Sequence, residues 1–206
     1  MQSNIRSFVK RSLLSLALPL ALAGALWPGL ALADIKVGDT VEQPTLRDAN
    51  DKPAMIPDLG KKVLLILYTD PGVADITDKF ADRVKALGLP EAHFRSIGVA
   101  NMADAKGLAN WLIRIVVRSK IKKYNVTILT DPDLSLKNQW HLGETDDKSV
   151  VLLIDANRKV RYFHTNKKKK DELVGAEQDE AVKIVQEVVA EQSGGSYTPK
   201  ESPTRN

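Results

Sequence analysis

The sequence predicts an α/β fold of three layers, in which a central mixed sheet lies between two layers of helices. Residues 63–68 (Val-Leu-Leu-Ile-Leu-Tyr) and 150–154 (Val-Val-Leu-Leu-Ile) are apolar without alternation. Strands that helices cover on both faces have this pattern. Segments with apolar residues at helical spacing alternate with these and other strand-like runs. Such alternation places helices on the faces of a sheet.

The first half of the domain is expected to begin with a hairpin. Residues 34–62 contain several turn signals and predict a short hairpin ahead of the main domain. The strand over residues 63–68 is followed by a turn at residues 70–72. Residues 75–87 then have helical spacing, and Gly88 is placed to end that helix.

The second half continues the alternation of strands and helices. Its strands are expected at 94–99, 126–130, 150–154 and 160–163, its helices at 105–124, 134–140 and 177–192, and a hairpin turn at 155–158. In the helix 105–124 the residues expected to face the core are Leu108, Leu112, Ile115 and Val116, with Trp111 beside them. In the last helix they are Ala181, Val182, Val185, Val188 and Val189.

The first 33 residues are typical of a secretory signal peptide. A positively charged start precedes an apolar stretch, and Ala31-Leu32-Ala33 has the small-x-small pattern of a cleavage site. We expect cleavage after Ala33 and a periplasmic location. A retained membrane anchor is the alternative, but Pro19 and Gly24 interrupt the apolar stretch. The remaining chain is expected to form one domain over 34–192, followed by a polar, disordered tail over 193–206.

Charge and cysteine content restrict the possible functions. The chain has a net charge of +4, and Arg6, Lys10 and Arg11 of the leader supply three of these charges. The nearly neutral remainder does not favour a nucleic acid as a partner. The chain also contains no cysteine. Thiol–disulfide exchange and peroxide reduction need a thiolate, so the protein acting alone has no such reaction.

The order of these elements matches the thioredoxin layout with an N-terminal hairpin and a peroxiredoxin-style insertion. At closer range the chain resembles the YtfJ family of small exported thioredoxin-like proteins. The segments that carry this resemblance are 89–95 (Leu-Pro-Glu-Ala-His-Phe-Arg), 99–105 (Val-Ala-Asn-Met-Ala-Asp-Ala), 122–124 (Lys-Lys-Tyr), 140–142 (Trp-His-Leu) and 149–155 (Ser-Val-Val-Leu-Leu-Ile-Asp). The resemblance implies the thioredoxin-like fold and export, and it implies no reaction.

The same resemblance indicates where a redox site would lie. The paired cysteines of a thioredoxin-like reductase would fall near Gly72 and Asp75, and a peroxiredoxin pattern would run over Pro71, Asp75 and Asp78. Neither alignment contains sulfur, and Ser149 lies near the position of the proline that usually faces such a site. No catalytic residue is therefore assigned. The candidate binding residues of this degenerate site are Asp70, Pro71, Gly72, Asp75, Asp78 and Ser149.

The acidic residues of the turn allow two interpretations. Carboxylates suit hard cations such as calcium or magnesium, but residues 70–82 lack the spacing of a calcium loop. Aspartates in the first turn of a helix are also stabilised by its free N–H groups and its dipole. The three histidines, His93, His141 and His164, lack the spacing of a zinc site. We therefore assign no metal and no cofactor.

A basic stripe is the second candidate binding surface. Arg114, Arg118 and Lys122 recur at every fourth residue of the helix 105–124. They could meet an anionic membrane surface or an acidic protein, or simply form a solvated face. We predict a redox-inactive binding or accessory module for a periplasmic protein or a small ligand. The alternative is a degenerate redoxin-class enzyme that depends on a bound metal or on the thiol of a partner.

Overall fold

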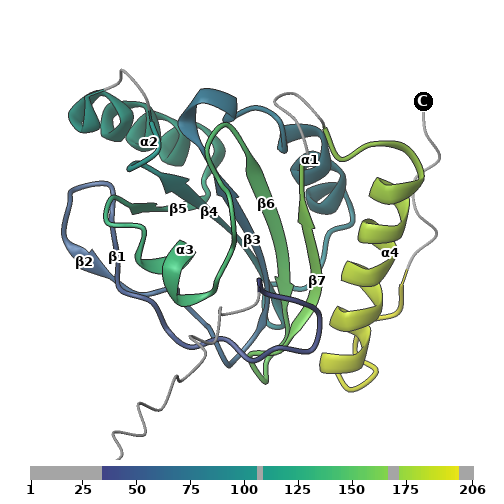
Figure 1. The fold of residues 1–206 in the computed structure, drawn as a ribbon. Coiled ribbons are helices and arrows are strands. Elements are labelled where there is room, and N and C mark those ends of the chain that lie inside the picture. The colour runs from purple at the N-terminus through teal and green to yellow at the C-terminus, as the bar shows by residue number, and fades with distance from the viewer. Residues whose placement is uncertain (1–33, 106–108, 167–171, 200–206) are drawn as a thin grey trace, which may run out of the picture. The chain divides into compact units, whose positions relative to one another are not determined.

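The computed structural model describes residues 34–105, 109–166 and 172–199, so the expected leader lies outside the described residues. A seven-stranded mixed sheet has the strand order β2-β1-β5-β4-β3-β6-β7 (Figure 1). The strands are β1 Leu46–Arg47, β2 Pro53–Ala54, β3 Val63–Thr69, β4 Phe94–Asn101, β5 Thr127–Asp131, β6 Ser149–Ile154 and β7 Val160–Thr165. The helices are the 3-10 helix η1 Pro71–Val73, α1 Asp78–Ala86, α2 Asn110–Tyr124, α3 Ser135–Gln139 and α4 Gly175–Gln192.

β3 and β6 are neighbouring strands in the interior of the sheet. They are antiparallel, with Leu64 opposite Ile154 and Thr69 opposite Ser149. On its other side β3 pairs in parallel with β4, which pairs in parallel with β5. Every residue of β6 is buried. The two apolar runs of the sequence therefore form buried strands in the interior of the sheet, as expected, and the sheet is mixed.

Helices cover both faces of the sheet and complete the three layers. On one face α1 and α4 pack on Leu65 and Leu153, and α2 packs on the same side over β4 and β5. On the other face α3 and the N-terminal segment cover Ile66 and Leu152. Figure 1 shows α3 on the opposite side of the strands from α1 and α2. The predicted α/β fold of three layers is confirmed.

Local predictions at the two ends of the domain are confirmed in most places. The expected hairpin exists, because β1 and β2 pair antiparallel. All five expected inward residues of α4 are buried. Residues 193–199 differ from the disordered tail that was predicted. The Tyr197 N–H donates to Ser193 Oγ at 3.1 Å, and the Tyr197 ring packs against the core under α4. Residues 200–206 of the tail lie outside the described residues.

The first long helix begins later than predicted. It begins at Asp78 and not at Asp75, because the segment before it forms consecutive tight turns. The Ile76 N–H donates to the Val73 carbonyl at 3.0 Å, and the Asp78 N–H donates to the Asp75 carbonyl at 3.2 Å. Asp75 therefore lies in a turn ahead of the helix and does not stabilise its first turn. Gly88 ends the helix as expected, with a φ of +60°.

The inward face of α2 was predicted wrongly. Ile113 and Val117 are buried, at 4% and 5% exposure. The expected core residues are exposed instead: Trp111 at 59%, Leu112 at 41%, Ile115 at 47% and Val116 at 54%. Leu108 lies outside the described residues. We call the four exposed residues the outer face of α2. Within the part of the chain that the structure describes, no helix combines the length and apolar character needed to span a bilayer.

Candidate functional site

The turn after β3 contains Asp70, Pro71 and Gly72, three of the residues predicted to form a degenerate site. Asp70 is buried and precedes η1, whose first position is occupied by Pro71. Asp70 Oδ1 accepts a hydrogen bond from the Gly72 N–H at 2.7 Å, and Oδ2 accepts one from the Asp147 N–H at 3.0 Å. A Cβ added at Gly72 would lie 3.2 Å from Asp70 Oδ1. Asp70 therefore closes the turn and fastens it to the loop before β6.

The other two acids of the predicted cluster have separate surroundings. Asp75 is exposed, and its Oδ1 lies 3.2 Å from Lys120 Nζ of α2. Asp78 begins α1, where burial raises the pKa of its carboxyl group and the Lys120 charge opposes that rise. Across residues 34–105, 109–166 and 172–199, no three histidine, aspartate or glutamate side chains are placed to hold a metal ion together. The turn therefore does not gather Asp70, Asp75 and Asp78 around one point.

Ser149 closes the site from the side of β6. It is buried opposite Thr69, and the two hydroxyl oxygens are 2.9 Å apart. The Ser149 N–H donates to Asn166 Oδ1 at 2.6 Å. The cavity beside Ser149, which Ile76 and Thr77 also line, has a volume of about 10 Å³. That volume is at the lower limit for a single water molecule. The position predicted for a degenerate redox site is therefore filled by side chains that are bonded to their neighbours.

A buried polar network that was not predicted from the sequence lies at the ends of the strands. The Tyr68 hydroxyl donates to Asp131 Oδ2 at 3.2 Å, and Asp131 also accepts from the Ser135 and Leu136 N–H groups at the start of α3. Burial raises the pKa of Asp131, although these backbone donors oppose the rise. Burial also raises the pKa of Tyr68. The signal was an aspartate directly after a buried strand and shortly before a helix.

The second part of this network is centred on Asp104. Its Oδ2 accepts from Asn101 Nδ2 at 2.6 Å and from Thr145 Oγ1 at 2.8 Å, and Lys137 Nζ lies 3.5 Å away. Burial raises the pKa of Asp104, but these hydrogen bonds and the lysine outweigh it and hold the pKa below 3.8. The network joins the ends of β3, β4 and β5 to the loop before β6. We interpret this network as structural, because its polar groups bond to one another.

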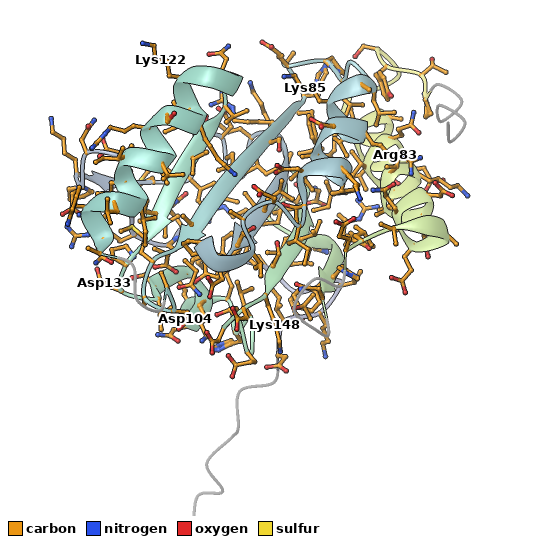
Figure 2. The ribbon with its side chains drawn as sticks, turned by 90° about the horizontal axis from the view of Figure 1, so that it is seen from above. Arg83, Lys85, Asp104, Lys122, Asp133 and Lys148 are labelled. Atoms are coloured by element: carbon orange, nitrogen blue, oxygen red, sulfur yellow. The ribbon has the colours of Figure 1, made fainter. Side chains whose placement is uncertain are left out.

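The predicted basic stripe is divided between two roles. Arg114 forms an ion pair with Asp51 of the N-terminal hairpin, with Nη2 and Oδ1 2.6 Å apart. Arg118 Nη1 donates to the Ala49 carbonyl at 3.0 Å. These two contacts fasten the hairpin to α2. Lys122 is exposed and forms no ion pair with any described residue, and Figure 2 shows it at one end of α2.

The outer face of α2 is an apolar surface that was predicted to lie in the core and that the structure places in solvent. Its residues lie one helical turn apart in two pairs, Trp111 with Ile115 and Leu112 with Val116. Large apolar side chains that are grouped on one exposed face indicate an interaction site, whereas scattered ones do not. A tryptophan in such a group adds a large, rigid contact area.

Comparisons with known proteins agree with the architecture. No protein-family model matches the sequence, and no curated protein matches it. A peroxiredoxin-like protein from Aquifex aeolicus has 18% identity and a TM-score of 0.55, over 76% of this chain and 89% of that chain. A thiol peroxidase from Chromobacterium violaceum has 14% identity and a TM-score of 0.55, over 75% and 88%. A thiol:disulfide interchange protein from Bacteroides sp. has 14% identity and a TM-score of 0.52, over 79% and 96%. The chain therefore has the α/β fold of the thioredoxin-like and peroxiredoxin-like proteins.

Proposed function

We propose that this protein is an exported, redox-inactive binding module of the YtfJ type, which contacts a partner protein in the periplasm. The proposal rests on one observation, which is that the predicted redox site has no reactive thiol and no open turn. The chain has no cysteine, and the turn at that position is closed by the buried Asp70 carboxylate. A protein of this fold that has no reactive group at the usual site can still act through the surfaces with which it binds other molecules.

The outer face of α2 is the surface that supports binding best. The exposed Trp111 lies beside three exposed aliphatic residues, and Lys122 follows at the end of the same helix. Aromatic and aliphatic anchors bordered by charge are the composition of a protein interface. The acidic turn supports binding less well, because Asp70 is bonded internally and Asp75 is paired with Lys120.

Site-specific photo-cross-linking tests the proposal in cells that express the full chain. In the test variant a photoreactive phenylalanine analogue replaces Ile115. In the control variant it replaces Val37, which lies on the N-terminal segment and is 60% exposed. We expect a defined protein adduct from position 115 that is lost when Leu112→Asp is added, and none from position 37.

Cell fractionation and N-terminal sequencing test export, with Asp34 as the expected first residue. A cytoplasmic, uncut protein or the same adducts from both positions would contradict the proposal.

A further inference from the structure

Half of the outer side of β5 has no strand beside it. β5 pairs with β4 from Thr127 to Asp131. On its other side the described residues provide one partner position, where Arg47 of β1 meets Thr130. The stretch Thr127–Leu129 therefore presents backbone N–H and C=O groups at an open sheet edge. Such an edge is a template for pairing with another extended chain.

A hollow of about 430 Å³ lies along this open edge, and we call it the β5 hollow. One wall is the turn of the N-terminal hairpin, and the other is the second half of α2. Its lining residues are Asp48, Ala49, Asn50, Arg118, Ile121, Lys122, Val126, Thr127, Ile128 and Leu129. The contacts of Arg114 with Asp51 and of Arg118 with Ala49 hold the two walls together. A groove with fixed walls costs less conformational entropy to fill than one that must form on binding.

The charges of the β5 hollow favour an acidic occupant. Arg118 gives one guanidinium nitrogen to the Ala49 carbonyl, and its other nitrogens have no partner among the described residues. Lys122 also lacks an ion-pair partner among them. The single acid of the lining, Asp48, accepts from the Lys52 and Asn50 N–H groups, and the Lys52 bond is the main cause of its lowered pKa. The charged side-chain donors of the hollow are therefore Arg118 and Lys122, while the rest of its lining is neutral apart from Asp48 and mostly apolar.

We propose that the β5 hollow binds an extended acidic segment of a partner protein, which adds as a strand beside Thr127–Leu129. Backbone hydrogen bonds to the open edge would give affinity, and alternate side chains of the segment would face the hollow. Acidic side chains on that segment would pair with Arg118 and Lys122. This inference rests on the proposed function in one respect, since it takes the protein to be a binding module. Lys122 borders both surfaces, but the open edge of β5 is a different binding surface from the outer face of α2.

The test uses a set of synthetic eight-residue peptides that alternate Glu with Val, Ile or Phe, acetylated and amidated at their ends. Binding to the purified mature protein is measured by fluorescence anisotropy, and amide hydrogen exchange is measured by NMR. We expect slower exchange at Thr127, Ile128 or Leu129 in the presence of peptide. We expect Lys122→Glu to weaken binding at least about tenfold. The matched control is Lys85→Glu, an equal charge change at an exposed residue of α1 (Figure 2), and it should leave the affinity unchanged.

Modified peptides separate strand addition from simple charge attraction. Peptides with N-methyl groups on alternate backbone nitrogens should lose binding, since they cannot donate to the sheet edge. Peptides with Lys in place of Glu should also fail to bind. Equal binding of the N-methylated peptides, or unchanged exchange at Thr127–Leu129, would overturn the inference. Failure of every peptide while the cross-link from position 115 persists would reject this inference alone and leave the proposed function standing.

Discussion

At the scale of single residues, the carboxylates at the strand ends bond to backbone N–H groups and neighbouring side chains of the protein. Asp70 accepts from two backbone N–H groups, and Asp131 caps the start of α3. Buried acids of this kind are stable because each charge is distributed over several donors. They position the loops around the predicted site, and they explain why acids in that region do not by themselves indicate a metal site.

We predict that Asp104→Asn lowers the free energy of unfolding by about 1–2 kcal/mol at pH 7, because hydrogen bonds to a charged acceptor are lost. The folded-state pKa of Asp104 is held below its ordinary value of 3.8. Its stabilisation is therefore complete above that value and disappears as the pH falls through the folded-state pKa. Urea unfolding of both proteins at pH 7 and pH 3 measures the effect. An equal difference at the two pH values would contradict the prediction.

At the scale of elements, α2 has one apolar face on the sheet and a second in solvent. Ile113 and Val117 pack over β4 and β5, while the outer face of α2 lies on the other side of the helix. Burial of the first face stabilises the fold, and exposure of the second carries a cost in solubility unless a partner covers it. The two isoleucines Ile113 and Ile115 therefore have different roles, although they lie two residues apart.

We predict that Ile113→Ala lowers the free energy of unfolding by about 2–5 kcal/mol, since it creates a cavity under α2. The same change at Ile115, which is 47% exposed, should alter it by no more than about 0.5 kcal/mol. Chemical denaturation of the two variants beside the parent protein measures both values. A large loss for Ile115→Ala would show that the outer face of α2 is already covered by the protein itself, and the binding proposal would lose its support.

The sequence predicted some elements of the fold better than others, for physical reasons. β3, β6 and α4 could be predicted because long apolar runs or a single apolar stripe allow one arrangement. In α2, residues 111–117 contain one polar residue, Arg114, so their spacing fits two faces equally well. Only the set Ile113, Val117 and Ile121 continues to the end of the helix. The proposed role of the candidate site stays a prediction, and the hydrogen bonds of its residues could not be predicted because they depend on Asp147 and Asn166, which are distant from Asp70 and Ser149 in sequence.

At the scale of the whole molecule, the protein has a thioredoxin-like fold, and internal hydrogen bonds occupy the position predicted for a redox site. We predict that the double variant Gly72→Cys/Asp75→Cys does not reduce insulin above background. The new Cβ at Gly72 would press on Asp70, and a neighbouring carboxylate raises the pKa of a thiol and so lowers its thiolate fraction. Turbidity of insulin with dithiothreitol as the reductant measures this, with a thioredoxin as the positive control. Clear turnover would favour the degenerate-enzyme alternative.

The pairing of β3 with β6 also has a kinetic consequence. Leu64 lies opposite Ile154, so the centre of the sheet cannot close until the chain has been made through residue 154. Loop-closure entropy opposes this distant contact before any stabilisation is gained. Folding is therefore expected to take on the order of milliseconds to seconds, as for other topologies rich in distant contacts. This delay would serve the proposed export, because a precursor that is still extended can be threaded through a membrane channel.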